Sequence, residues 1–232
     1  MNLEQWLACA SEEYLSGEFL GLSDRLLRLF ACACLRRVWA LLPASSCRDA
    51  VEACEQFTDG LLRADQLYEA WIKSELETEE GLWRERFWWD DDDGPRWPAD
   101  EDDQLLRGVQ ATLRQSSRMA ARAALYAADL VAWGEGEEGR QAERLAQHRL
   151  YCDVLGQPRL TRLDASWLRW HDGTVAKMAR AIHSERCFAD LPILADALEE
   201  AGCTDGAILE HCRSEPIHVR GCWVVELLLG NG

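Results

Sequence analysis

The sequence has 232 residues, which is enough for one large domain or two small ones. Of these residues 48% are hydrophobic, so the chain can bury a substantial core. Its formal net charge of −16 argues against direct binding to nucleic acid or to an anionic membrane, and it leaves a basic protein partner open. The most apolar stretch, residues 26–42, contains Arg28, Arg36 and Arg37, so we expect no membrane-spanning helix there.

Ten cysteines would predict disulfide bonds in a small secreted protein. However, the first residues, MNLEQWLACASEEYL, contain neither the basic start nor the apolar core of a signal peptide. Several cysteines also occupy apolar positions of helical patterns, as buried thiols do. We therefore expect reduced cysteines and a cytoplasmic location.

Helical periodicity dominates the first 80 residues. A short helix is expected at residues 3–9, and a stronger one begins at Ser23 and ends at Pro43. The stronger helix is apolar on nearly all sides, which is typical of a central helix. Two further helices are expected at residues 46–58 and 64–80. The positions expected to face the core are Leu26, Leu27, Phe30, Cys34, Leu41, Val51, Cys54, Phe57, Leu67 and Trp71.

The composition changes at residues 81–103, which carry four tryptophans and a dense acidic run. Residues 90–103 contain eight carboxylates against one arginine, Arg96, which gives a local charge of −7. One interpretation is a docking element for a basic protein, in which indole rings supply affinity and charge steers association. The other is a solvated loop whose tryptophans pack on their own domain. The candidate partner-binding residues are Trp88, Trp89, Asp90, Asp91, Asp92, Asp93 and Trp97.

The second half of the chain is also predicted to be helical. A long helix is expected over residues 104–133, and a loop should follow because three glycines come in quick succession. Another helix should run to about Leu155, with Leu145 and Cys152 facing inward. The residues expected in the loop are Gly134, Gly136 and Gly139, and Pro158 is expected in a connector. Two short helices are expected to start at Asp164 and Thr174.

The last forty residues contain three helix-like segments. The first follows Asp190 and ends at Gly202, and Thr204 is the expected cap of a shorter second one. The third, residues 222–229, fits a helix or a buried strand by length, and we favour a helix because its apolar residues share one face. The apolar positions behind these predictions are Leu191, Leu194, Ala195, Leu198, Ile208, Leu209, Cys212, Val219, Cys222, Trp223 and Leu227.

These patterns predict an all-α protein, an irregular multi-helix bundle interrupted by an acidic, tryptophan-rich insertion. We expect a helical subdomain at residues 1–80, the insertion or linker at residues 81–103, and a second helical subdomain at residues 104–232. The two subdomains are expected to form one compact domain.

Three phrases of this sequence resemble a family of uncharacterised proteins common in planctomycete-type bacteria. They are DRLLRLFACACLRRVW near the start and LPILADALEEAGCTD and HVRGCWVVELLLG near the end. The resemblance extends along most of the chain and least over the acidic middle section. It implies a bacterial cytoplasmic protein, and it carries over no activity, cofactor or functional residue.

The strongest candidate for chemistry is a metal site near the C-terminus. Its residues are Cys203, His211, Cys212, His218 and Cys222, and zinc binds four thiolate or imidazole ligands of these kinds. Their spacing matches no standard zinc motif, and the adjacent pair would point about 100° apart on a helix. The alternative, which we favour on sequence alone, is that Cys212 and Cys222 are core thiols, His211 lies on the surface and His218 caps a helix.

Other signals for catalysis are weak. The sequence contains no phosphate-binding glycine loop, no G-x-S-x-G elbow, no H-E-x-x-H and no paired C-x-x-C. Pairs at i, i+4 spacing could place a base beside a thiol, and a His–Asp pair in a loop could act as acid and base, but we favour packing for the first and turn formation for the second. The residues in question are His148 with Cys152, His183 with Cys187, and His171 with Asp172.

The sequence therefore favours a non-catalytic interaction or scaffold module that binds a basic protein through its acidic segment. A structural zinc-binding protein is the alternative, and a thiol-dependent enzyme comes third. No cofactor is expected under the first interpretation, and zinc is expected under the second.

Overall fold

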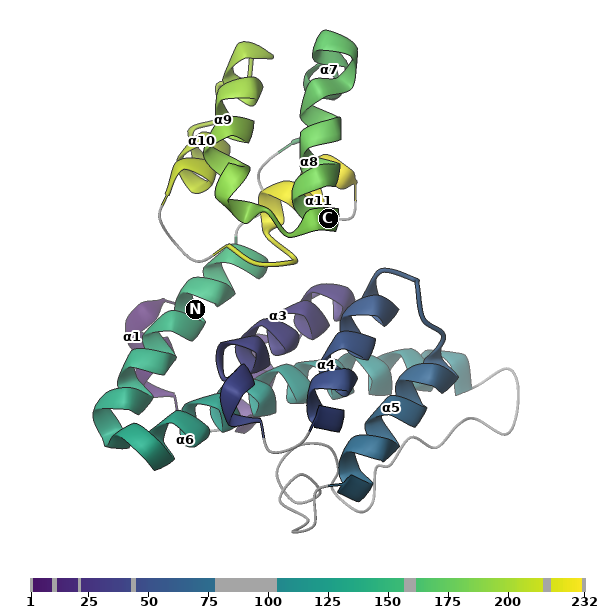
Figure 1. The fold of residues 1–232 in the computed structure, drawn as a ribbon, viewed down its shortest axis with the longest axis vertical. Coiled ribbons are helices and arrows are strands. Elements are labelled where there is room, and N and C mark those ends of the chain that lie inside the picture. The colour runs from purple at the N-terminus through teal and green to yellow at the C-terminus, as the bar shows by residue number, and fades with distance from the viewer. Residues whose placement is uncertain are drawn as a thin grey trace. The chain divides into compact units, whose positions relative to one another are not determined.

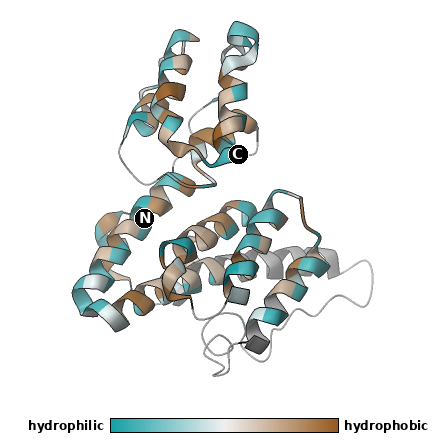
Figure 2. Cartoon of the chain, in the orientation of Figure 1, coloured by the Kyte–Doolittle hydropathy of each residue, from teal (hydrophilic) through white to brown (hydrophobic). Residues whose placement is uncertain are grey.

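The computed structural model of the chain describes residues 2–9, 12–20, 22–42, 45–77, 104–156, 162–214 and 218–230. Within these ranges the ordered elements are all helices, and no strand is present among them, which confirms the all-α prediction (Figure 1). The chain divides into two compact units, Met1–His148 and Arg149–Gly232. Figure 2 shows hydrophobic and hydrophilic residues alternating along the helices of each unit, as amphipathic helices require.

The first unit contains the helices expected from the N-terminal half, together with a short one that the sequence did not predict, α2. The helix after Ser23 is shorter than expected, because it turns into a 3₁₀ segment before Leu41, whose side chain is exposed. The bounds are α1 (Leu3–Ala8), α2 (Glu12–Glu18), α3 (Asp24–Arg37), η1 (Trp39–Leu41), α4 (Ser45–Thr58) and α5 (Ala64–Glu77).

The range α6 (Gln104–Val154) consists of two helices that join at a kink among the glycines, as predicted for residues 104–133 and for the helix that runs to about Leu155. The glycine cluster does not open a loop: only Gly136 leaves helical geometry, with φ 70° and ψ −160°. Glycine adopts positive φ at little cost, so this residue kinks the helix while the chain on both sides stays helical. Most of α6 belongs to the first unit, and its last turn, residues 149–154, belongs to the second.

Aromatic rings form the centre of the first unit. Trp6 of α1 packs edge-on against Phe30 of α3 at a centroid distance of 5.9 Å, and Phe19 lies 5.7 Å from Phe30. All three side chains are fully buried. This cluster joins the N-terminal segment to α3, and such aromatic pairs stabilise a core beyond their buried area.

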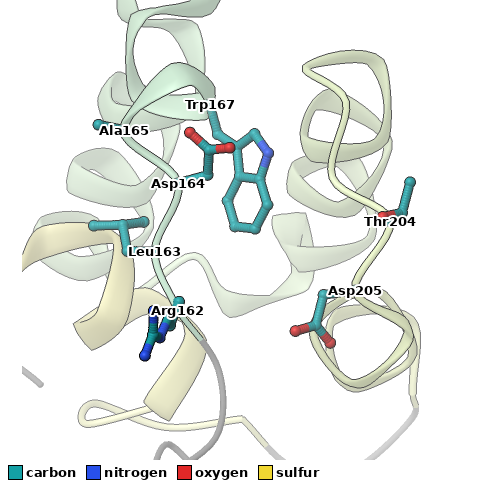
Figure 3. Close-up of a pocket in the computed structure, with 7 residues that line it drawn as sticks. All are labelled: Arg162, Leu163, Asp164, Ala165, Trp167, Thr204 and Asp205. Atoms are coloured by element: carbon teal, nitrogen blue, oxygen red, sulfur yellow. The ribbon is translucent and has the colours of Figure 1, made fainter.

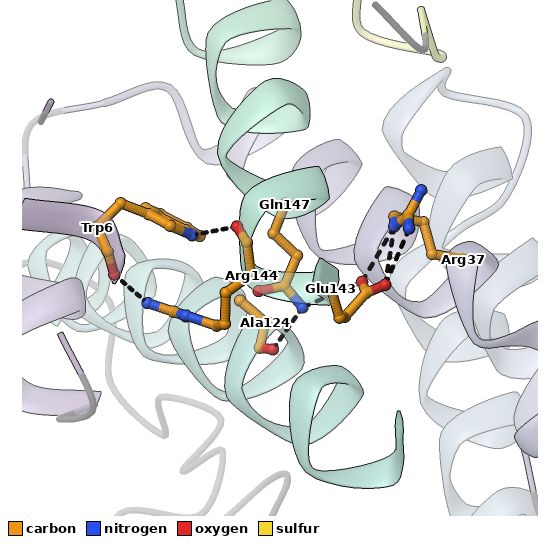
Figure 4. A network of polar contacts seen from close by, with 6 residues as sticks. All are labelled: Trp6, Arg37, Ala124, Glu143, Arg144 and Gln147. Carbon is orange, nitrogen blue, oxygen red and sulfur yellow. Dashed lines mark hydrogen bonds and ion pairs between the residues drawn. The ribbon is translucent and has the colours of Figure 1, made fainter. Parts of the chain in front are cut away.

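Charged residues are also buried in the first unit, where they connect α1 to α6 (Figure 4). The indole N–H of Trp6 donates to the main-chain oxygen of Arg144 at 2.8 Å. In return, the guanidinium of Arg144 donates to the main-chain oxygens of Trp6 and Cys9, and it lies 4.7 Å from the centre of the Trp6 ring. The buried guanidinium therefore satisfies carbonyl groups at the end of a six-residue helix.

Two further contacts attach α6 to its neighbours in the first unit (Figure 4). Arg37, at the end of α3, forms an ion pair with the buried carboxylate of Glu143 at 3.0 Å. The amide of Gln147 donates to the main-chain oxygen of Ala124 at 2.7 Å, across the kink of α6. These contacts use groups from both helical segments of α6, so they fix the angle of its kink.

The second unit consists of short helices around an apolar core. The core side chains come from every helix of this unit, and most of those facing inward are fully buried. The run at residues 222–229 is helical, as predicted, rather than a strand. The bounds are α7 (Ala165–Arg169), η3 (Trp170–Gly173), α8 (Thr174–Glu185), η4 (Phe188–Asp190), α9 (Leu191–Glu200), α10 (Gly206–Arg213) and α11 (Trp223–Leu229).

One helix cap in the second unit differs from the prediction, and one predicted helix start agrees with it. Asp205, not Thr204, caps α10, because its carboxylate accepts the main-chain N–H groups of Ala207 and Ile208. Thr174 is the first residue of α8 and its hydroxyl donates back to the carbonyl of His171. The N-cap of α8 is Gly173, which forms no side-chain hydrogen bond.

The observed division of the chain also differs from the expected one. The sequence placed the boundary at the acidic segment, whereas the division of the chain into its two units falls within α6, between residues 148 and 149. A change of composition marks an insertion, but it does not show which helices share a core. The acidic segment itself, residues 81–103, lies outside the described residues.

Candidate metal centre

Four side chains that can bind a metal ion converge in the second unit. They are Asp153 from the last turn of α6, His211 from α10, His218 from the connector before α11, and Cys222, the residue that precedes α11. One ligand atom from each lies within 4.8 Å of the ligand atoms of the other three. The group therefore joins four segments that are separated in sequence.

The cluster is withdrawn from solvent. The side chain of Asp153 is fully buried, that of His218 is 7% exposed and that of His211 is 13% exposed. Cys222 is also fully buried. Buried charged and polar groups are costly unless they are paired or bind a metal, so the contacts within this group decide whether it is satisfied without an ion.

Asp153 is the centre of the group. Its Oδ1 atom lies 2.7 Å from His218 Nδ1 and 3.1 Å from His211 Nε2, and its Oδ2 atom accepts the main-chain N–H of Val219 at 2.9 Å. Burial by itself would raise the pKa of Asp153, but hydrogen bonds and positive charge from the two histidines lower the pKa below its ordinary value. The carboxylate is thus ionised at neutral pH, as a metal ligand must be.

Trp223 fixes the protonation of His211. Its indole N–H donates to His211 Nδ1 at 3.1 Å, so Nδ1 must present a lone pair. A neutral His211 then carries its proton on Nε2, which faces Asp153 and lies 3.3 Å from Cys222 Sγ. A metal ion bound at Nε2 would displace that proton, and the ring would have to move it to Nδ1 and release the hydrogen bond with Trp223, or remain without a proton.

One of the two ring nitrogens of His218 forms no hydrogen bond. Its Nδ1 atom faces Asp153, while its Nε2 atom is buried and forms no hydrogen bond. An unsatisfied buried polar atom costs about 1–3 kcal/mol, so such atoms usually mark a missing partner. A histidine ligand often contacts an outer-shell carboxylate through its other nitrogen, so an ion held by both Asp153 and His218 requires this ring to turn its Nε2 atom toward the group.

Cys222 supplies the sulfur. Burial, followed by the negative charge of Asp153, raises the pKa of the Cys222 thiol well above its ordinary value. The thiol is therefore protonated at neutral pH in the protein alone. A bound zinc ion would remove that proton, because coordinating thiols deprotonate outright.

The structure brings together three of the five residues predicted for the metal site: His211, His218 and Cys222. Cys203 and Cys212 are not in the group, although both are buried in the core of the same unit. Burial raises the pKa of Cys203, and it raises that of Cys212 to about 12, so both are core thiols.

The packing alternative was wrong for the two histidines. His211 is not a surface residue, and His218 does not cap a helix but contacts the buried Asp153. Asp153 itself was missed by sequence reasoning. The available signal was an acidic residue on a buried helix face, between the fully buried Leu150 and Val154.

The other candidate thiols lack the features of nucleophiles. Cys152 was expected to face inward but is exposed, and burial of its sulfur still raises the pKa of its thiol. The pKa of Cys187 is raised by desolvation and by Asp190, and its thiol donates to the carbonyl of Ala181 at 3.7 Å. Reactive thiols need a lowered pKa, so neither residue supports a thiol-dependent enzyme. None of the ten cysteines, all of which are described, forms a disulfide.

The predicted acid–base pair and an open hollow offer no better site. His171 and Asp172 are both exposed and adopt left-handed backbone conformations at a turn. Figure 3 shows a hollow of about 650 Å³ in which the carboxylates of Asp164 and Asp205 lie on either side of Trp167. Both carboxylates cap helices, at α7 and α10, so they serve the fold rather than a ligand.

No protein-family model, curated protein or solved structure matches this chain. The resemblance to planctomycete-type proteins therefore stays a prediction. Among the helices that the structure describes, none is both long enough and apolar enough to cross a membrane. The candidate partner-binding residues of the acidic segment, from Trp88 to Trp97, lie outside the described residues.

Proposed function

We propose that this protein binds a divalent transition metal, with zinc as the best fit, and that the ion stabilises its C-terminal helical unit. The observation that carries the proposal is the convergence of Asp153, His211, His218 and Cys222, with a buried nitrogen of His218 left without a partner. A metal ion would satisfy that nitrogen and neutralise the buried charges.

The chemistry of the donors favours zinc. Two imidazoles, one thiolate and one carboxylate are borderline ligands, whereas magnesium and calcium prefer oxygen alone. Zinc bonds of about 2.0–2.3 Å place ligand atoms roughly 3.3–3.6 Å apart in a tetrahedron. The distances from His211 Nε2 to Asp153 Oδ1 and Cys222 Sγ, 3.1 and 3.3 Å, are near those values. His218 Nδ1, at 2.7 Å from Asp153, would move outward or the ring would present Nε2.

The number of ligands favours a structural rather than a catalytic role. Four protein ligands complete the tetrahedron of a structural zinc ion, whereas catalytic sites keep one position for water or substrate. The ligands here come from α6, α10, the connector and the start of α11. An ion held by all four would fasten these short segments to one another.

Metal content tests this proposal. Full-length protein purified under reducing conditions without added metal, then analysed by inductively coupled plasma mass spectrometry, should contain about one zinc per chain. Asp153→Asn and Cys222→Ser should lose the metal. Cys212→Ala is the matched control, because it removes a buried thiol of the same unit that is outside the group. Absence of metal in the wild type, together with no binding in a zinc titration, would contradict the proposal.

The interaction role inferred from the acidic segment is a second proposal. Its support is the sequence: eight carboxylates and their neighbouring tryptophans would meet a basic protein surface, with the indole rings supplying most of the affinity. The two proposals concern different parts of the chain, and a zinc-stabilised unit is compatible with a docking segment.

A further inference from the structure

The side chain of Trp133, on α6, is the most exposed of the large apolar side chains that the structure describes. It is 81% exposed, whereas Trp6, Trp167 and Trp223 are 0%, 8% and 6% exposed. An indole ring has a large apolar surface that gains free energy when it leaves water, and tryptophan is enriched where proteins bind one another. An indole left this open to solvent is therefore a candidate contact for a partner.

The kink of α6 presents this indole. Trp133 lies in the last turn before Gly136, whose φ of 70° and ψ of −160° are accessible almost only to glycine. Just beyond the kink, a Cβ atom on Gly139 would lie 2.4 Å from the Cβ atom of Glu135, so the two sides of the bend approach as closely as glycine allows. Figure 1 shows α6 changing direction at this kink. The bend is therefore well defined, and the indole is held beside it.

Acidic residues follow Trp133 along the kink. Glu135, Glu137 and Glu138 are exposed, and residues 129–140 carry four carboxylates against one arginine, a local charge of −3. That arginine, Arg140, already forms ion pairs with Asp129 and Glu137. Among the described residues, neither Glu135 nor Glu138 has an ion-pair partner. The helix dipole accounts for acidic residues in the first turn after the kink, but not for a bare indole beside them.

The first unit covers other tryptophan rings with its own cations. The guanidinium of Arg36 lies 4.6 Å from the centre of the Trp39 ring, and that of Arg144 lies 4.7 Å from the centre of the Trp6 ring. In the part of the chain that the structure describes, no guanidinium lies over Trp133. This ring is thus open to a cation from outside the chain.

We propose that Trp133, Glu135 and Glu138 form a docking surface for a basic segment of another protein, with a lysine or arginine side chain of that segment over the indole. The electron-rich face of a tryptophan ring attracts such a cation. The two unpaired carboxylates attract further cations of the same segment and steer its approach. Because the bend holds these groups in place, the surface loses little conformational entropy when it binds.

Charge decides which partner fits this surface. The chain has a formal net charge of −16, and the surface beside Trp133 is itself acidic, so two copies of the chain would repel each other there. An anionic membrane or a nucleic acid is disfavoured for the same reason. A basic protein segment has the opposite charge and the side chains that suit both the ring and the carboxylates. The surface is separate from the metal centre and from residues 81–103, so it depends on neither of the proposals above.

Fluorine nuclear magnetic resonance of the full-length protein labelled with 5-fluorotryptophan tests this surface at the residue itself. Trp133→Phe and Trp39→Phe identify the two resonances by their absence. The probe is an oligoarginine peptide, with an oligoserine peptide of the same length as its control. The oligoarginine peptide should shift the Trp133 resonance and leave that of Trp39 in place, because Arg36 already covers the Trp39 ring. Salt at about 1 M should reverse the shift by screening the charges.

Charge variants test the two carboxylates. The double variant Glu135→Gln with Glu138→Gln keeps the side-chain size, and it should raise the dissociation constant read from the Trp133 shift about three- to tenfold, since exposed ion pairs are individually weak. Glu200→Gln is the matched control, because Glu200 is an exposed glutamate on α9 in the other unit, and it should leave the constant unchanged. Circular dichroism of each variant checks that it is folded.

Several results would overturn the proposal. They are a Trp133 resonance that stays in place throughout the peptide titration, equal shifts of Trp39 and Trp133, and a double variant that binds as tightly as the wild type. A Trp133 shift caused by raising the protein concentration alone would assign the surface to a second copy of the chain instead. A shift caused by vesicles of phosphatidylserine and phosphatidylcholine would assign it to a membrane.

Discussion

The free energy that a zinc ion adds to the second unit can be predicted and measured. Metal is first removed from the wild type and from Asp153→Asn with a chelator, and zinc is then added back to each protein. Asparagine keeps the size of aspartate but removes the charge that faces both histidines. If the ion is held by all four residues, the variant should lose the response to zinc.

The magnitude follows from linkage. An ion that binds only the folded state at a free concentration of a hundred times its dissociation constant stabilises that state by about 2.7 kcal/mol. The second unit spans residues 149–232. For a unit of this size, 1 kcal/mol shifts the melting temperature by about 4–8 °C. Zinc should therefore raise the melting temperature of the unit by about 10–20 °C.

Differential scanning calorimetry of the full-length chain measures this shift, with magnesium as a control ion. Asp153→Asn will also melt at a lower temperature without metal, because it weakens the buried contacts with the histidines. The comparison is therefore between the shifts that zinc causes in each protein, not between their melting temperatures. Cys212→Ala should show the full shift, since Cys212 is outside the ligand group. The reasoning fails if zinc causes no shift in the wild type, or an equal shift in Asp153→Asn.

Four further predictions concern other residues. Trp223 should change its fluorescence when zinc binds, because its hydrogen bond to a ligand histidine must either break or be made to a ring with no proton; an emission spectrum that zinc leaves unaltered would contradict this. Zinc affinity should rise about tenfold per pH unit near neutrality, as measured by competition with a chelator, because the Cys222 thiol has a raised pKa and must lose its proton. Arg144→Met should destabilise the first unit by about 2–4 kcal/mol in urea unfolding, because the buried main-chain oxygens of Trp6 and Cys9 each lose a hydrogen bond from the guanidinium, whereas Arg63→Ala, at an exposed ion pair, should have little effect. Deletion of residues 90–103 should preserve helical content but abolish capture of a basic protein partner, and retention of the same partners by the deletion variant would refute the docking role.

Asp153 also gives the second unit a dependence on acid pH. Its pKa in the folded protein is lower than the ordinary value of 3.8, so its ionised form stabilises the fold. Because the pKa of Asp153 is lower in the folded protein than in the unfolded chain, its ionised form stabilises the fold fully above pH 3.8. This stabilisation is lost as the pH falls through the pKa of the folded state. Acid titration of the metal-free protein should show this loss in the wild type, and Asp153→Asn should lack it.

Most of the fold could be predicted from the sequence, because amphipathic periodicity is a local property. The buried positions Leu191, Leu194, Ala195 and Leu198 followed directly from their spacing. The break in α6 was predicted at its glycines, but its form, a kink at Gly136 alone and not a loop, was not, because glycines indicate freedom of the backbone without showing which neighbouring contacts will form. Gln147, whose amide bonds to Ala124 across Gly136, is such a contact, and it forms only in the folded unit.

The candidate site could be predicted only in part. His211, His218 and Cys222 lie close together in the sequence, so their proximity in space was a reasonable inference. Asp153 precedes His218 by 65 residues, and nothing local connects them. Cys212 was included because it is adjacent to His211, yet neighbours on a helix point in different directions, and its side chain enters the core instead.

The most direct test of the metal centre is X-ray absorption spectroscopy at the zinc edge on the full-length, zinc-loaded protein. The four residues predict one sulfur at about 2.3 Å and three nitrogen or oxygen ligands at about 2.0–2.2 Å. Cys222→Ser should remove the sulfur signal or the zinc itself. A site with two or more sulfurs would bring in Cys203 or Cys212 and contradict the proposed ligand set, and a shell of six oxygen or nitrogen ligands would show that zinc binds elsewhere on the chain.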